Sequence, residues 1–185
     1  MAGMGVSKQL PIKRDCSWIP PKFENALVGT FDCSSDPTDH LPNGGYNCIA
    51  WAAGKTDVWW WPTDDPSAFW PAGLDREAPG EETIDNFIKA FKREGYIRCK
   101  NGKFKRGIEK VAIYATDKGI PTHAARSLPK RVWTSKMGSG EDIEHKTLSV
   151  VEGKEYGKAV KFLKRRLDKK PFLSQRIWSF FRGFF

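Results

Sequence analysis

The sequence predicts an α+β fold in which two helices precede a run of antiparallel strands. A short helix is expected at 48–53 and an amphipathic helix begins at Glu81, whereas residues 96–136 hold several strand patterns separated by turn signals. The chain has 185 residues, of which 39% are hydrophobic and 29% charged. That length and composition fit one globular domain with a core of its own.

The first helix is expected directly after a loop-rich segment. Residues 1–46 are rich in Pro, Gly, Asp and Ser and show little periodicity, so they predict loops and short turns. Asn47 is a good N-cap, the helix-forming run CIAWAA follows it, and Gly54 suits the end of a helix.

An aromatic segment, VWWWPTDDPSAFWPAG, follows at 58–73. Its prolines exclude a regular helix, so it predicts either a packed loop or the wall of a cleft. Tryptophans that line a cleft can stack on sugars, bases or peptide side chains. The candidate substrate-binding residues are Trp51, Trp59, Trp60 and Trp61, with packing in the core as the alternative for all four.

The second helix and the strands follow from periodicity. Apolar residues at 84, 87, 88 and 91 have helical spacing, and Gly95 suits the helix end. Strands are then expected at 96–99, 103–107, 110–116, 121–128 and 132–136. Ser139 with Asp142 resembles a capping box and predicts a short helix through His145 and Leu148.

The C-terminal segment differs from the rest of the chain in charge. Residues 151–185 hold ten Lys and Arg and three acidic residues, a net charge of +7 that leaves +2 for residues 1–150. Helical spacing of apolar residues predicts a helix over 153–168, and six aromatic residues lie in 172–185. We therefore expect two parts, 1–150 and a basic, aromatic-rich helical segment at 151–185. An anionic membrane or a protein partner would suit residues 172–185; nucleic acid is also conceivable, although no nucleic-acid-binding motif supports it.

The cysteines and the absence of targeting patterns bear on location. The N-terminal residues lack the apolar core of a secretory signal, and no apolar run approaches the roughly 20 residues that span a bilayer. A cytoplasmic protein with free thiols is therefore expected, and delivery as an effector is compatible with this. A zinc site made of Cys16, Cys33, His40 and Cys48 is the alternative, but the wide spacings contain no C-x-x-C pair, so no metal is expected.

Cys48 is the candidate nucleophile. A thiol at a helix N-terminus faces free N–H groups and the positive end of the helix dipole, which favour the thiolate and lower the pKa. His123, on a predicted strand, is the candidate base for this thiol. The alternative for Cys48 is a small buried apolar residue, and the alternative for His123 is a structural or solvated side chain.

The order of these residues resembles the papain-like fold, a group that includes papain, the NlpC-type cell-wall peptidases and the CHAP amidases. The resemblance covers about residues 43–145: a helix-starting Cys in NCIAWA, a His in the strand THAARSL, then a strand ending WTSKMG. It implies a papain-like catalytic domain over 1–150 with Cys48 packed on an antiparallel meander. The segments also look like those of an uncharacterised bacterial family.

The third catalytic residue, which orients the histidine in papain, differs in this chain. Where papain has an Asn in Asn-Ser-Trp-Gly, this chain has Thr-Ser-Lys-Met-Gly at 134–138. Ser135 is one substitute; Glu141, Asp142 and His145 are the others. For the oxyanion hole we expect the side chain of Asn43 beside the backbone N–H of Cys48, because Asn47 would be occupied as a helix cap. His40 and His145 are expected to be solvated or surface residues.

Two functions follow from these patterns. The first is a cysteine-dependent hydrolase or acyl transferase acting on amide bonds, such as a peptidase, deamidase or amidase, in the manner of a thiol protease with a Cys–His pair and no cofactor. Its substrate would be a peptide, a protein or a peptidoglycan-like amide, and a toxin or effector with this chemistry fits as well. The second is a non-enzymatic binding module that uses the basic, aromatic C-terminal segment.

Overall fold

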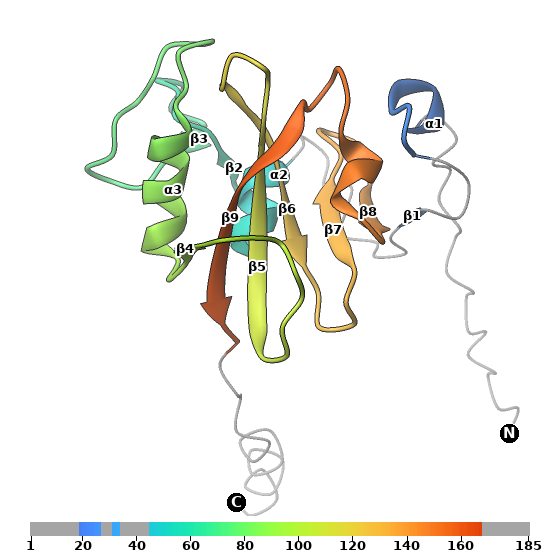
Figure 1. Cartoon of the computed structure of the whole chain (residues 1–185). Coiled ribbons are helices and arrows are strands. Elements are labelled where there is room, and N and C mark those ends of the chain that lie inside the picture. Colours follow the sequence, from blue (N-terminus) through green and yellow to red (C-terminus); the bar gives the residue numbers. More distant parts are fainter. Residues whose placement is uncertain (1–18, 27–30, 34–44, 168–185) are drawn as a thin grey trace, which may run out of the picture.

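A seven-stranded antiparallel sheet forms the centre of the protein (Figure 1). The computed structural model describes residues 19–26, 31–33 and 45–167. The strands of this sheet are β1 (Phe31–Cys33), β4 (Ile97–Cys99), β5 (Ile108–Ala115), β6 (Pro121–Ser127), β7 (Trp133–Lys136), β8 (Asp142–His145) and β9 (Lys158–Arg166). Their spatial order is β1-β8-β7-β6-β5-β9-β4. A smaller parallel pair joins β2 (Trp59–Trp60) to β3 (Ala68–Phe69). The predicted α+β class is confirmed.

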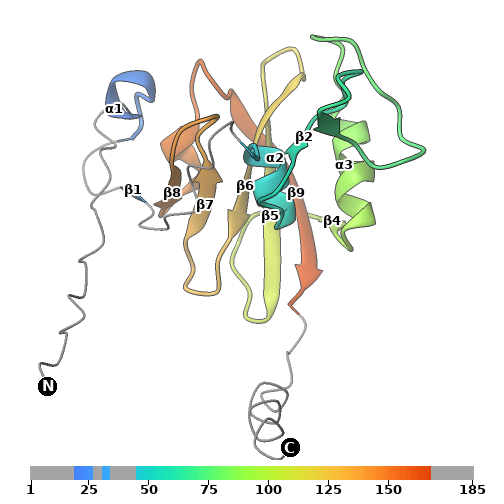
Figure 2. The ribbon, with the colours of Figure 1, turned by 180° about the vertical axis from the view of Figure 1, so that it is seen from behind.

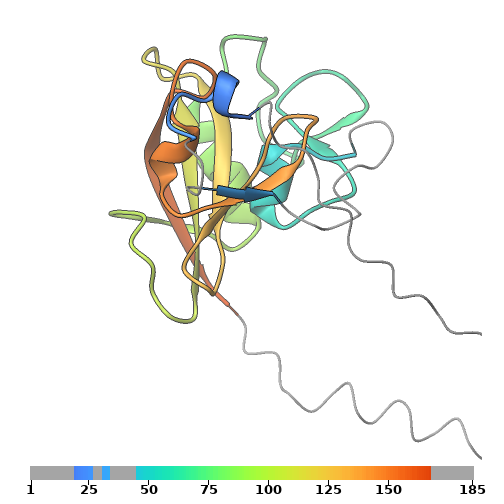
Figure 3. The ribbon, with the colours of Figure 1, turned by 90° about the vertical axis from the view of Figure 1, so that its right-hand side faces the viewer.

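Two helices cover one face of the large sheet. Figure 2 shows α2 (Cys48–Ala53) in front of the sheet and α3 (Ile84–Arg93) beside it, and the side view in Figure 3 shows α2 and the β2–β3 segment on the same side. The first core cluster fills this layer. It includes Ile49, Ala52, Phe87, Phe91, Val111, Ile113, Ala124 and Leu163, all buried.

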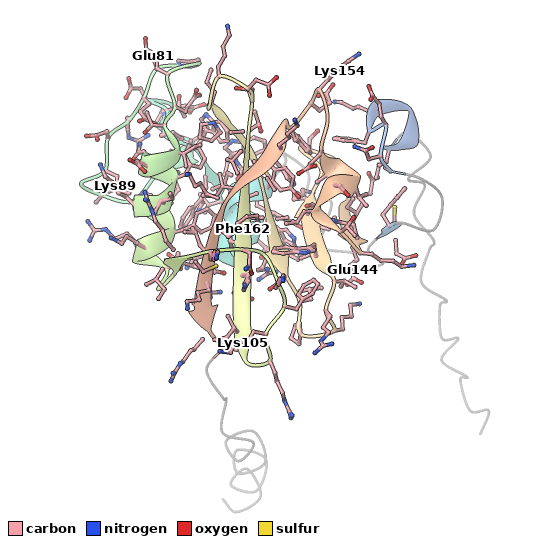
Figure 4. All side chains as sticks on the ribbon, viewed as in Figure 1. Glu81, Lys89, Lys105, Glu144, Lys154 and Phe162 are labelled. Atoms are coloured by element: carbon pink, nitrogen blue, oxygen red, sulfur yellow. The ribbon has the colours of Figure 1, made fainter. Side chains whose placement is uncertain are left out.

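The opposite face of the sheet carries a second core cluster. It is closed by α1 (Ile19–Lys22) and by the 3-10 helix η2 (Leu148–Val151). Its buried members include Ile19, Phe23, Ala112, Tyr114, Ala125, Trp133, Ile143 and Val150. Consecutive residues of β5 alternate between the two clusters, as a strand with two covered faces requires. In Figure 4 Phe162 lies over the middle of the sheet, while the labelled Lys and Glu side chains lie toward its rim.

The cap signals predicted for α2 are confirmed, whereas α3 begins at Ile84 and not at Glu81 as predicted. The Asn47 side chain accepts a hydrogen bond from the backbone N–H of Ala50, and Gly54 ends α2 with a φ of 84°, in the left-handed region. Thr83 caps α3 in the same way through the N–H of Asn86. Such caps satisfy backbone groups that a helix terminus leaves without partners.

The predicted helix at 153–168 is wrong, because this segment forms strand β9. It pairs with β5 over its whole length and with β4 on its other side, so it lies inside the sheet. The sheet therefore continues past the expected boundary at residue 150. The rest of the expected helical segment, from residue 168 onward, lies outside the described residues.

Three smaller expectations are also corrected. The predicted helix through His145 and Leu148 is replaced by β8 and η2. The predicted strand at 103–107 contributes only an isolated bridge between Lys105 and Ile108. Cys33 is disulfide-bonded, contrary to the expectation of free thiols, whereas Cys48 and Cys99 are free.

Candidate functional site

Cys48 is the first residue of α2 and lies against strand β6. Its side chain is buried, with 6% of its surface exposed. Burial raises the pKa of the thiol to about 11, although the backbone N–H groups of Ala124, Ile49 and Cys48 itself favour the thiolate. The predicted lowering of this pKa is therefore wrong: loss of hydration outweighs the helix terminus. At neutral pH Cys48 is a protonated thiol.

His123, Ser135 and His145 form a buried hydrogen-bonded chain. The Nε2 atom of His123 lies 3.0 Å from the Ser135 Oγ, which lies 2.9 Å from the Nε2 of His145. The Nδ1 of His145 lies 2.7 Å from the backbone oxygen of Thr147. These groups come from β6, β7, β8 and the turn after β8, so the sheet order brings them together.

The partners fix the proton positions along this chain. A carbonyl oxygen only accepts, so the Nδ1 of His145 carries its proton and its Nε2 accepts one from the Ser135 hydroxyl. The Ser135 oxygen then accepts from the Nε2–H of His123. The Nδ1 of His123 is left without a proton; it is buried and has no hydrogen-bond partner among the described residues.

Both imidazoles are held in the neutral form. Burial lowers the pKa of His123 well below its usual value, and His145 lowers it further. Burial also lowers the pKa of His145 to about 4, against the opposing hydrogen bond to the Thr147 backbone. His145 was expected at the surface; it is instead 1% exposed and is the far end of the chain.

Tyrosine rings fix the plane of the His123 imidazole. The Tyr156 ring stacks on it, with centroids 4.0 Å apart and planes 5° from parallel, and the Tyr114 ring meets it edge-on at 5.2 Å. Burial raises the pKa of the Tyr156 phenol, and the nearby Cys48 raises it further. Cys48 therefore interacts electrostatically with the phenol of the tyrosine whose ring stacks on His123.

Cys48 and His123 approach the same point of β6 from different sides. Alternation along this strand places Ala124 in the first cluster with Cys48, while His123 faces Tyr114 of the second cluster. Strands β6 and β7 pair only at Arg126–Thr134 and Ser127–Trp133. The His123–Ser135 hydrogen bond lies beyond that paired part. No hydrogen bond joins the Cys48 sulfur to His123 in the described part of the chain.

Of the predicted orienting residues, Ser135 contacts His123 and Asp142 does not. The Oδ2 of Asp142 instead accepts a hydrogen bond of 2.8 Å from the Tyr46 hydroxyl. The Lys136 ammonium lies 4.7 Å from the centre of the Tyr46 ring. These residues tie the segment before Cys48 to β7 and β8. Asn43, expected in the oxyanion hole, and His40 lie outside the described residues.

The four candidate tryptophans have different environments. Trp60 is buried in the core, and Trp51 donates its indole N–H to the Thr134 hydroxyl under the Arg126 guanidinium. Of the four, Trp59 and Trp61 line one of the cavities characterised in the described residues, together with Gly45, three residues before Cys48. Neither Cys48 nor His123 lines the four cavities characterised in the described residues.

The described residues also bear on two other classes of site. No group of three or more His, Cys, Asp or Glu side chains there is arranged to hold a metal ion. Within the same ranges no helix has the length and apolar character needed to cross a membrane.

The fold and the buried Cys, Ser and His side chains define an α+β domain with chemistry-bearing groups at the centre of one sheet. A family model described as a domain of unknown function, DUF7689, matches residues 37–164. The chain belongs to this family, and the match contains α2, the whole His123–Ser135–His145 chain and most of β9. No curated protein and no solved structure matches the chain.

Proposed function

We propose that this protein is a papain-like, cysteine-dependent hydrolase or acyl transferase that acts on amide bonds. The observation that carries the proposal is the unprotonated Nδ1 of His123, which is buried without a partner among the described residues and belongs to β6, the strand that Cys48 contacts. Burying an imidazole nitrogen without a hydrogen bond costs free energy of folding. A role as general base, which requires an unprotonated nitrogen, is one reason for such an arrangement. Its substrate would be a peptide, a protein or a peptidoglycan-like amide.

The reaction begins from a neutral thiol and a neutral imidazole. As the Cys48 sulfur bonds to the carbonyl carbon of the amide, the thiol proton passes to the Nδ1 of His123 and the C=O electrons move to oxygen. This transfer requires Cys48 and His123, which share no hydrogen bond in the described residues, to come within hydrogen-bond distance when the substrate is bound. The backbone N–H of Cys48 donates to that oxygen. When the oxyanion collapses, the C–N bond breaks and His123 returns the proton to the leaving nitrogen. Water, or another acceptor in a transferase, then displaces Cys48 from the thioester.

Ser135 and His145 act on the base and not on the substrate. A positive charge forms on His123 when Nδ1 takes the proton, which strengthens the hydrogen bond from its Nε2–H to the Ser135 oxygen. His145 keeps that oxygen oriented as an acceptor by taking the Ser135 proton into its own hydrogen bond. Tyr156, stacked on the ring, restricts rotation of the imidazole.

Acylation of Cys48 by an activated ester tests this function directly. Purified protein is mixed with p-nitrophenyl acetate, release of nitrophenolate is followed, and the acylated residue is mapped by mass spectrometry. We expect a burst with the acyl group on Cys48, because a neighbouring base removes the thiol proton during attack. Cys48→Ala should abolish the burst, His123→Gln should slow it by roughly 100-fold or more, and Ser135→Ala should slow it less.

Cys99 is the internal control, since it is free and more exposed than Cys48. If the ester acylates Cys99 and leaves Cys48 unmodified, or if His123→Gln acylates as fast as the unmodified protein, the proposed function is wrong. In that case the non-enzymatic binding module is favoured.

A further inference from the structure

A surface cavity between the segment before α2 and the β2–β3 pair is negatively charged, although the protein is positively charged. Its volume is about 420 Å³. The lining includes Gly45, Asp57, Trp59, Trp61, Asp65 and Ser67. Two of them are acidic and none is basic, although the chain as a whole has a net charge of +9. The cavity is therefore a negative site on a positive protein.

Both carboxylates are available to a ligand. Neither Asp57 nor Asp65 forms an ion pair with a described Lys or Arg. The Asp65 Oδ1 accepts hydrogen bonds of 2.8 Å and 2.7 Å from the Ser67 backbone N–H and hydroxyl. These bonds orient the carboxylate and lower its pKa, so Asp65 stays ionised, and its Oδ2 has no partner among the described residues.

The aromatic part of the cavity is held in place by the core. Alternation along β2 directs Trp60 inward, so its neighbours Trp59 and Trp61 lie on the cavity side. The Trp61 indole N–H donates to Glu82 at 3.1 Å, and its ring meets Phe87 edge-on at 5.3 Å. Trp59 is 36% exposed. One ring is thus fixed, and the other offers an accessible face.

The cavity is also fixed relative to Cys48. The Asn47 side chain, which caps α2, donates its Nδ2–H to the Trp60 carbonyl at 2.7 Å, while its Oδ1 accepts from the Trp60 N–H at 3.3 Å. Trp60 lies between the two cavity tryptophans, and Asn47 precedes the candidate nucleophile. A group bound in the cavity would therefore sit at a constant position with respect to the N-terminus of α2.

We propose that this cavity binds a cationic side chain, the guanidinium of arginine or the ammonium of lysine. Unpaired carboxylates attract the charge, and tryptophan offers the aromatic face that such cations prefer. Binding itself does not require Cys48. That the bound cation belongs to the amide substrate, and so sets a preference for a basic residue near the reacting bond, rests on the proposed function.

Ligand binding to the full chain, followed by ¹H–¹⁵N NMR of the tryptophan indole groups, tests the site. The probes are acetyl-arginine amide and its neutral isostere acetyl-citrulline amide. We expect arginine to shift the Trp59 and Trp61 signals. Citrulline should bind about fivefold more weakly, because an exposed ion pair strengthens binding by a factor of up to about five. Asp57→Asn and Asp65→Asn should each weaken arginine binding about threefold, and the pair together by more.

Asp64→Asn is the matched control, because Asp64 is an exposed carboxylate beside Asp65 that does not line the cavity. It should bind arginine like the unmodified protein, and so should Cys48→Ala, which separates this site from the proposed reaction. Equal binding of arginine and citrulline would overturn the proposal. So would tighter binding of N-acetylglucosamine at the same signals, unaffected by Asp57→Asn and Asp65→Asn, since that result would indicate a sugar site.

Discussion

Ser135 joins two buried imidazoles through one hydroxyl group. It donates to His145 and accepts from His123, so both of its hydrogen-bonding roles are used inside the protein. The backbone oxygen of Thr147 sets the direction of the whole chain, because it determines which nitrogen of His145 carries the proton. A backbone group in the turn after β8 thus decides which atom of His123 is free to act as a base.

Burial of neutral histidines makes the stability of the fold depend on pH. The pKa of His145 is about 4 in the folded protein, against about 6.5 when unfolded, so the unfolded chain binds the extra proton between these values. Stability is therefore full above pH 6.5 and is lost as the pH falls toward 4. His145 alone should account for a loss of about 2 kcal/mol between pH 7 and pH 5, and His123 acts in the same direction.

Urea unfolding at pH 7 and pH 5 measures this loss. His145→Gln should be less stable than the unmodified protein at pH 7 but should lose less stability on acidification. If acidification costs the two proteins the same free energy, His145 is not the group that titrates.

The sequence could predict part of this site from local signals. Cys48 was placed at the start of a helix because Asn47 and Gly54 mark that helix from both ends. Ser135 followed from its place after the predicted His123 strand. The sequence offers His145 only as one of several orienting candidates and places it at the surface, and it does not predict the raised pKa of Cys48, because burial by distant segments decides both and no local pattern reports such burial.

At the scale of elements, β9 shows why helical spacing of apolar residues predicted a helix where the chain forms a strand. Tyr156, Val160, Leu163 and Leu167 have spacing near 3.6, yet Leu163 is buried in the first cluster while Phe162 packs on the second. The many Lys and Arg residues of β9 reach solvent with their long side chains, so they hide the alternation of a strand between two core layers. Pairing with β5 and β4 decides the conformation, and that pairing is non-local.

The start of β9 depends on a glycine. Gly157 has a φ of 69°, and a Cβ on it would lie only 1.9 Å from the backbone oxygen of Ala115. We expect Gly157→Ala to destabilise the protein by about 3 kcal/mol or more, because both the left-handed backbone and the end of β5 would be disturbed.

Gly119→Ala is the matched control for this prediction. Gly119 has a φ of 81°, but a Cβ there would meet nothing within 4 Å. It should cost only about 1 to 2 kcal/mol, the penalty of the left-handed conformation itself. Equal losses of unfolding free energy for the two variants would show that the close approach of Gly157 to β5 contributes nothing.

At the scale of the whole molecule, one sheet joins strands from β1 near the start of the described residues to β9 near their end. β9 lies between β5 and β4, and the family match ends within it. The predicted division at residue 150 would remove a strand that pairs on both sides. The α+β class was accessible from the order of helix and strand patterns, but the strand order was not, because it is fixed by pairing between distant segments.

Truncation distinguishes the predicted separate segment that starts at residue 151 from a sheet that includes β9. A chain of residues 1–150 lacks β9 and should show no cooperative thermal transition, because β4 would lose its partner strand and β5 one of its two. A chain of residues 1–170 keeps every described element and should unfold cooperatively. Circular dichroism during heating measures both. Cooperative unfolding of the 1–150 chain would support the predicted boundary and contradict the role given to β9.

The central claim is that the Nδ1 of His123 is an unprotonated base, and its protonation can be observed. Long-range ¹H–¹⁵N NMR spectra distinguish the two neutral forms of each histidine from the charged form. At pH 7 the account predicts that His123 carries its proton on Nε2 and His145 on Nδ1, with both rings neutral, and that Cys48→Ala leaves both assignments unchanged. A proton on the Nδ1 of His123, or a charged His123 at that pH, would contradict the account.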